Sequence, residues 1–206
     1  MSGDQQILKM EGFLTIRDYN TGEVLQEAKN AINYENMSEA IADTLSSRGY
    51  GEIYQMAFGN GGASVDETGV ITYLPPNTTG QNAALYNQTY AKIVDDTSVF
   101  NLDPTRNKMT VFHTTGRVYT DILVQCLLDY GEPAGQAAFD NSTQTDSNYI
   151  FDELGLLENY GTYANGNIIT RLLTHVIFHP VQKSLNRQIQ IDYTVRIQSL
   201  TNLVTI

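Results

Sequence analysis

Three histidines are the first candidates for chemistry, because an imidazole can bind a metal ion or transfer a proton near neutral pH. His175 and His179 lie four residues apart, a spacing that would place them on one face of a helix. The surrounding run, Leu172 to Phe178, is however rich in apolar residues and ends before Pro180, so it predicts a strand. On a strand this spacing does not bring the two rings together. We therefore expect an ordinary hydrogen bond for His175 and no metal site.

A glycine-rich loop at residues 59–62 (Gly-Asn-Gly-Gly) follows a predicted strand and raises the question of phosphate binding. A phosphate loop needs a lysine and a helix N-terminus after the glycines. The residues that follow here, 63–69, contain two acids and no lysine. The loop is therefore predicted to be a flexible connection with positive φ at several positions, and not a nucleotide site.

Nucleophiles and carboxylates form no recognisable catalytic set. The Gly-x-Ser-x-Gly motif of hydrolases is absent from the sequence. Adjacent acids such as Asp152 and Glu153 point to opposite faces of a strand and cannot act as a pair. The single cysteine, Cys126, lies in an apolar run and is predicted to be a small buried hydrophobe. We therefore expect no enzyme, no metal and no cofactor.

The longest run with strand periodicity is Gln188 to Gln198, near the C-terminus. Its apolar residues all have odd numbers and its polar residues have even numbers, which is the pattern of a strand with one buried face. The run Leu172 to Phe178 is predicted to pair with it in an antiparallel manner. The odd-numbered face is predicted to build the core and consists of Ile189, Ile191, Tyr193, Val195 and Ile197.

Further segments have the composition of strands, and one has the spacing of a helix. The helix is predicted to begin at a capping box of Asn36 with Glu39 and to stop at Gly49. Its apolar residues recur at helical spacing and are predicted to face the sheet; they are Met37, Ala40, Ile41 and Leu45. Two long polar segments, at about 68–103 and 129–148, are predicted to be insertions without regular structure. The remaining predicted strands are Ile7 to Asp18, Glu23 to Ala28, Ile53 to Phe58, Met109 to Thr114, Arg117 to Leu128 and Tyr149 to Leu157.

These elements predict the fold class and the domain organisation together. About eight strands and one helix in a chain without internal repeats favour a single domain over residues 1–206. The predicted fold is mainly β: an antiparallel, jelly-roll-like β-sandwich with one short N-terminal helix and long polar loops.

The charge balance and the apolar runs exclude two kinds of partner. The chain has 23 acidic and 12 basic residues, a net charge of −11, and no lysine or arginine cluster. Duplex nucleic acid is therefore not expected, because its binding depends on neutralising phosphates. No apolar run approaches the roughly 20 residues of a membrane helix, and the N-terminus lacks the features of a secretory leader. We expect no membrane contact and synthesis in a reducing cytoplasm.

A series of short motifs runs through most of the chain. They are residues 12–16 (Gly-Phe-Leu-Thr-Ile), 21–24 (Thr-Gly-Glu-Val), 30–32 (Asn-Ala-Ile), 56–62 (Met-Ala-Phe-Gly-Asn-Gly-Gly), 85–87 (Leu-Tyr-Asn), 172–180 (Leu-Leu-Thr-His-Val-Ile-Phe-His-Pro) and 190–197 (Gln-Ile-Asp-Tyr-Thr-Val-Arg-Ile). In this order they resemble virion structural proteins of tailed bacteriophages, which include collar, neck, decoration and fibre-attachment components.

The resemblance implies a non-enzymatic subunit that assembles in multiple copies at a phage head, neck or tail, in a virion built in the host bacterial cytoplasm. Its partners would be other copies of itself and capsid, connector or tail proteins. The alternative is a carbohydrate-binding β-sandwich that attaches to the host surface; the absence of tryptophan favours assembly. The candidate interface residues lie in the first long loop and are Tyr73, Leu74, Pro75, Pro76, Leu85, Tyr86 and Tyr90.

Overall fold

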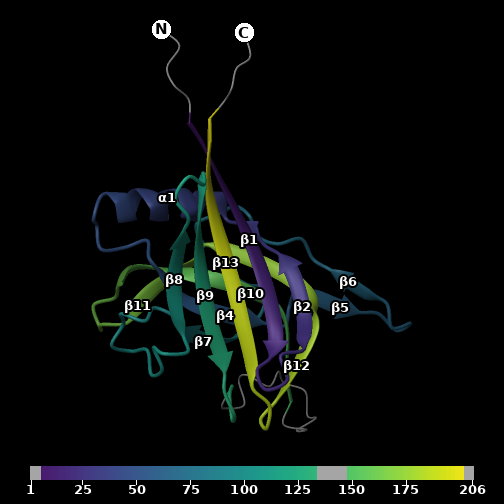
Figure 1. Ribbon diagram of the computed structural model, residues 1–206. Coiled ribbons are helices and arrows are strands. Elements are labelled where there is room, and N and C mark those ends of the chain that lie inside the picture. The colour runs from purple at the N-terminus through teal and green to yellow at the C-terminus, as the bar shows by residue number, and fades with distance from the viewer. Residues whose placement is uncertain (1–5, 134–147, 202–206) are drawn as a thin grey trace, which may run out of the picture.

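The computed structural model describes residues 6–133 and 148–201, which are mainly β-strand (Figure 1). The helix is α1 (Tyr34–Leu45). The strands are β1 (Gln6–Asp18), β2 (Val24–Lys29), β3 (Ala31–Ile32), β4 (Ile53–Gly59), β5 (Ala63–Val65), β6 (Ile71–Tyr73), β7 (Gln88–Ile93), β8 (Lys108–His113), β9 (Tyr119–Leu128), β10 (Asn148–Thr162), β11 (Ile168–Leu172), β12 (Thr174–Ser184) and β13 (Ile189–Thr201).

Two antiparallel sheets form the body of the molecule. The first has the strand order β2-β1-β13-β9-β8, and the second has the order β3-β12-β10-β4-β7, with β11 beside β10. In Figure 1 the first sheet stands in front of the second, and the β5–β6 hairpin extends to one side. The predicted class, a mainly β antiparallel sandwich with one helix, is confirmed.

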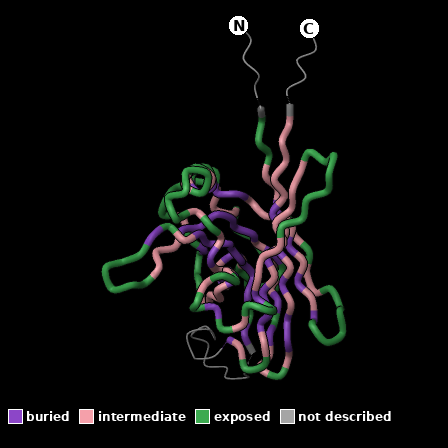
Figure 2. The backbone as a smooth tube through the Cα atoms, turned by 60° about the vertical axis from the view of Figure 1, so that its left-hand side comes forward, coloured by how far each residue is buried: buried purple, intermediate pink, exposed green. Residues whose placement is uncertain are grey.

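The core lies between the two sheets, where Figure 2 shows the buried residues. Four of the five residues predicted on the odd-numbered face of β13 belong to the core, since Ile189, Ile191, Tyr193 and Val195 are buried. Ile197 is only half-buried and lines the groove under α1, so the prediction is wrong for this residue. The second sheet contributes aromatic residues, with Phe151 edge-on to Phe58 at a centroid distance of 5.4 Å. Because one cluster of buried side chains contains residues from both sheets, the sheets share a single apolar core.

The predicted pairing of Leu172 to Phe178 with the last strand is wrong. β13 pairs with β1 and β9 in the first sheet, whereas β12 pairs with β10 and β3 in the second. The two segments therefore face each other across the core. β12 also continues past Pro180, which lies at a register shift relative to β10, where a missing ladder hydrogen bond is tolerated. Alternation along a strand reports its buried face but does not name its neighbour.

The predicted capping box at Asn36 is also wrong. The helix begins one turn earlier, where Asn33 Oδ1 accepts a hydrogen bond from the Asn36 N–H at 3.1 Å. Asn36 is instead buried, and its Nδ2 donates to Leu172 O at 2.8 Å. Two asparagines spaced three residues apart can each be read as an N-cap, and the one whose side chain is free to turn back towards the backbone takes the role.

The segment at 68–103 is more regular than predicted, because it contains β6 and β7. β7 pairs with β4 at the edge of the second sheet. With these short strands, the described residues form thirteen strands where about eight were expected. Of the second predicted insertion, residues 134–147 lie outside the described part of the chain.

The first and last strands form a two-stranded ribbon at the end of the molecule near α1 (Figure 1). β1 and β13 pair from Asp18↔Ile189 to Gln6↔Thr201, but β9 accompanies β13 only as far as Gln198↔Tyr119. β2 pairs only with residues 13–17 of β1. The tip of the ribbon therefore extends beyond both flanking strands.

Candidate subunit interface

Four of the seven predicted interface residues gather at the surface after β6. Tyr73, Leu74 and Tyr86 have 46%, 44% and 42% of their surface exposed, and Pro75 is exposed beside them. The Tyr86 hydroxyl donates a hydrogen bond to Pro75 O at 2.7 Å, which joins the two ends of this segment. Pro76 is half-buried behind them. Tyr73, Leu74, Pro75 and Tyr86 thus lie at one exposed apolar and aromatic surface.

Leu85 and Tyr90 do not belong to that surface. Tyr90 lies on β7, half-buried, with its ring 6.1 Å from that of Phe58, and burial raises the pKa of its hydroxyl above the ordinary value. Leu85 is buried, so its side chain stabilises the loop from within. Its apolar neighbours are Ala57, Leu157 and Leu172.

A buried carboxylate holds the segment that carries the exposed residues. Glu153 Oε1 accepts hydrogen bonds from the N–H groups of Asn87 (2.8 Å) and Gly61 (3.1 Å). Its Oε2 accepts from the Tyr86 N–H at 2.9 Å and lies 3.0 Å from His175 Nε2. Burial works to raise the pKa of Glu153, but the hydrogen bonds from His175 and the backbone outweigh it and hold the pKa below its usual value.

His175 completes this cluster as a buried strand histidine, as predicted. Its Nδ1 accepts a hydrogen bond from the Asn77 N–H at 2.9 Å, which requires that nitrogen to be unprotonated. Its Nε2 therefore carries the proton and donates to Glu153. Since Asn77 and Tyr86 come from the two sides of the same loop, the Glu153–His175 pair fixes that loop onto β10 and β12.

The prediction that the glycine-rich loop needs positive φ at several positions is wrong, because none of the glycines at 59, 61 and 62 has a positive φ. These glycines instead allow close approach. A Cβ at Gly59 would stand 2.4 Å from Glu153 Oε1, and one at Gly61 would stand 2.8 Å from Asn87 N. The loop amides are also occupied by the chain's own acids, since Asp152 accepts from the N–H groups of Gly62 (2.9 Å) and Ala63 (3.0 Å).

Asp152 and Glu153 reach the same loop although they are adjacent on a strand. The expectation that they point to opposite faces is wrong here, because β10 has a register shift against β12 between Phe151 and Glu153. Burial raises the pKa of Asp152, with a smaller contribution from the charge of Glu153. Both carboxylates are nonetheless committed to backbone amides and serve to position the loop.

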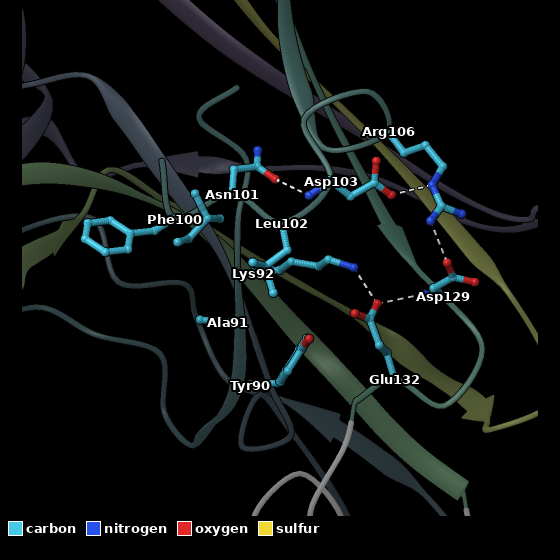
Figure 3. A pocket seen from close by; sticks show the side chains of 11 residues that line it. Tyr90, Ala91, Lys92, Phe100, Asn101, Leu102, Asp103, Arg106, Asp129 and Glu132 are labelled. Carbon is cyan, nitrogen blue, oxygen red and sulfur yellow. Dashed lines mark hydrogen bonds and ion pairs between the residues drawn. The ribbon is translucent and has the colours of Figure 1, made fainter. Parts of the chain in front are cut away.

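A polar pocket of about 260 Å³ lies at the other side of β7, and Figure 3 shows its lining. Its charged groups point towards one another: Lys92 pairs with Glu132, and Arg106 pairs with both Asp103 and Asp129. In these contacts two bases pair with three acids, and each ion pair links one loop or strand to another or closes a turn. We interpret this group of ion pairs as a structural contact, or joint, that holds the turn after β7 against the turn after β9.

Behind that joint lies the buried Lys183. Its Nζ donates to three backbone carbonyl oxygens, those of Glu132 (2.7 Å), Asp129 (2.9 Å) and Ser184 (2.9 Å). Burial lowers the pKa of this ammonium group to about 8. Its donors are thus used within the chain, as are those of the neighbouring Lys92, which donates to Leu127 O at 2.7 Å.

An apolar groove of about 380 Å³ separates α1 from the first sheet and was not predicted. The strand register places Val111, Ile122 and Val195 in one row on the inner face of that sheet. Met37, Ile41 and Leu45 of α1 line the opposite wall. Sequence alternation in the two central strands indicated the inward face. It could not show that the second sheet leaves this part of the face uncovered.

The helix is held over the groove by a polar link on its other side. Arg171 Nη1 binds Glu39 Oε2 at 2.9 Å, and Arg171 Nη2 binds the buried Glu158 Oε1 at 2.7 Å. A second hollow of about 240 Å³ on the β1 side shares Met10, Met37 and Ile41 with the groove. The underside of α1 is therefore incompletely packed at both margins.

Outside these surfaces the described residues offer little chemistry. Within residues 6–133 and 148–201, no three His, Cys, Asp or Glu side chains are placed to share a metal ion. Cys126 is buried, and burial raises the pKa of its thiol to about 12. The described helix, α1, is not long and apolar enough to cross a membrane.

Comparison with known proteins adds no assignment. A scan of protein-family models and searches of curated proteins and solved structures found no match to this chain.

Proposed function

We propose that this protein is a non-enzymatic structural subunit of a tailed-phage virion that assembles in multiple copies at the head, neck or tail. The observation that carries the proposal is that part of the first sheet is uncovered. There the apolar groove under α1 meets the edge strand β8, on which Val111 and Phe112 are exposed. Contiguous exposed apolar surface marks protein interaction sites in soluble proteins. The motif resemblance in the sequence supplies the virion context.

The second supporting surface is the exposed group around Tyr73, Leu74 and Tyr86. These side chains stand on a loop fixed by the buried Glu153–His175 pair, so the chain presents them in a defined geometry. A rigid aromatic and apolar surface loses little conformational entropy when a partner covers it. This arrangement suits repeated contact with other subunits.

The test is the size of the protein alone and in particles. Multi-angle light scattering should give a multimer for the purified chain at micromolar concentration, or a stable complex with a purified phage capsid, connector or tail. A chain that stays monomeric, joins no particle and binds a glycan array would instead support the carbohydrate-binding alternative.

A further inference from the structure

The β5–β6 hairpin, residues 62–74, is an arm that projects from the two sheets and has one apolar face. Among the described residues, β5 and β6 pair only with each other, and Figure 1 shows them extending to one side of the molecule. The register pairs Val65 with Ile71 and Ala63 with Tyr73, so these four side chains share one face. An isolated two-stranded hairpin is marginally stable at best in water, so the arm is suited to gain a further strand from a partner.

Hydrogen bonds within the chain give the arm a defined shape. At its tip, Asp66 Oδ1 accepts hydrogen bonds from the N–H groups of Thr68 (2.8 Å) and Val70 (2.9 Å). At its base, the Leu74 N–H donates to Gly62 O at 2.9 Å. The apolar face is nonetheless poorly covered, since Val65 is 61% exposed. A preformed arm of this kind loses little conformational entropy when a partner covers it.

An open strand edge lies on the opposite side of the molecule from the arm (Figure 1). This edge is β8, the last strand of the first sheet, and no strand within residues 6–133 and 148–201 pairs with its outer side. Val111 of β8 is exposed and also lines the groove under α1, as does Leu45, which is 82% exposed. A strand added beside β8 would extend the sheet and turn alternate side chains towards this groove.

The arm and the open edge carry opposite charges. The ionisable side chains of residues 62–74 near the tip are two acids, Asp66 and Glu67, and this segment has no lysine or arginine. Residues 108–117, which comprise β8 and the turn after it, contain Lys108 and Arg117 and no acid. In a chain with a net charge of −11, this edge is therefore a favourable place for an acidic arm. Exposed charges of this kind select the partner and its orientation, while the apolar face supplies most of the affinity.

We propose that the arm of one copy adds to β8 of a second copy and lays its apolar face over the groove under α1. The arm cannot make this contact within its own chain, because its base is fixed on the side opposite β8. The contact is therefore head-to-tail and repeats from copy to copy into a ring or a filament. This inference rests on the proposed function and names the partner as another copy of this chain.

Three single substitutions in the full chain test the contact by sedimentation velocity. Val65→Glu in the arm and Val111→Glu in the groove should each weaken association at least roughly tenfold and give a monomer, since each places a charge against apolar surface. Ser64→Glu is the matched control, because this exposed neighbour of Val65 lies on the other face of β5, and it should leave the multimer unchanged. All three positions are on short exposed strands or an edge, so circular dichroism should show the parent fold in each variant.

Mixing the two monomeric variants tests the head-to-tail geometry itself. The Val111→Glu chain keeps an intact arm, and the Val65→Glu chain keeps an intact β8 edge. An equimolar mixture should therefore form one contact and stop at a 1:1 dimer, because the other two surfaces are blocked. A mixture that stays monomeric would show that the arm and the β8 edge do not bind each other, and the inference would be overturned.

The remaining outcomes separate this inference from the proposed function. If both valine variants assemble like the parent, or if Ser64→Glu dissociates the multimer as Val65→Glu does, the arm-to-groove contact is wrong while assembly by another surface stands. A parent chain that stays monomeric but joins a phage particle also removes this contact and leaves the proposed function in place. A parent chain that neither assembles nor joins a particle removes both proposals.

Discussion

The buried cluster at Glu153 and the groove under α1 differ in how completely their side chains are partnered within the chain. Around Glu153, four donors converge on one carboxylate, and the loop that they hold is fixed. Under α1, apolar residues on two facing elements leave an open space. The buried charge of Glu153 is thus hydrogen-bonded within the chain, whereas the apolar surface between α1 and the first sheet is left partly uncovered. An open apolar margin beside a well-supported body is suited to a contact made after folding.

The largest expected effect distinguishes the core from the groove. Tyr193 is fully buried on the inner face of β13 and shares a hydrogen bond with Asn30, so Tyr193→Asp should cost several kcal/mol and unfold the protein. Val111→Asp, on the same sheet but 65% exposed, should cost less than about 1 kcal/mol. Thermal melts of both variants check this. Equal losses would mean that the groove is part of the closed core.

A smaller but still large effect is expected at the buried carboxylate. Glu153→Gln keeps the size of the side chain but turns an amide N–H₂ towards either the Gly61 and Asn87 donors or the Tyr86 and His175 donors, at a cost of about 2–5 kcal/mol. Glu67→Gln, at an exposed position, should change stability by less than about 0.5 kcal/mol. Urea denaturation measures both. Similar midpoints for the two variants would contradict the role assigned to Glu153.

A pH-dependent effect is expected at the turn after β1. Asp18 accepts a hydrogen bond from Arg187 Nε at 2.6 Å and from the Thr21 N–H at 2.9 Å, and the bond from Arg187 is the main cause that lowers its pKa from 3.8 to about 2. Because the folded pKa is depressed, its stabilisation is complete above about pH 4 and is lost as the pH falls through about 2.

The measurement for Asp18 is the difference in unfolding free energy between the parent and Asp18→Asn. We expect about 1 kcal/mol at pH 6, since Arg187 is partly solvent-exposed, and a decline towards zero between pH 4 and pH 2. A difference that stays constant over this interval would assign the effect of the substitution to something other than the charge.

Hydrogen exchange should show the same contrast within the first long loop. The amides of Tyr86 and Asn87, which donate to Glu153, should be protected in the isolated chain. The amides near Val99 and Leu102, whose side chains are 89% and 98% exposed, should exchange quickly and slow only if assembly covers them. Fast exchange at Tyr86 in the isolated chain would show that the loop needs a partner to be fixed.

The smallest expected effect is that of salt on assembly. Copies with a net charge of −11 repel one another, and raising salt from about 20 mM to 500 mM shortens the Debye length from roughly 20 Å to about 4 Å. Contacts made by apolar side chains should therefore persist or strengthen, as light scattering can show. Steady dissociation with rising salt would indicate that ion pairs with a basic partner hold the subunit.

Several features could be predicted from the sequence because they depend on neighbours along the chain. Alternation predicted the buried face of β13, and the β-rich surroundings of His175 predicted a histidine on a strand with an ordinary hydrogen bond. The structure exposes Tyr73 and Tyr86 of the predicted interface residues and buries Leu85, and the role of the exposed residues as an interface stays a prediction. An apolar residue in a polar loop looks the same in sequence whether it faces solvent or packs inward.

The sequence by itself determined the mainly β class, the positions of most strands and the inward parity of the last one, because periodicity is a local property of the chain. Only the tertiary structure decided that β12 and β13 lie in different sheets and that glycines at 59–62 make room for a carboxylate. It also decided that the first sheet stays partly uncovered beneath α1. These features depend on which distant segments meet, and sequence spacing carries no record of that.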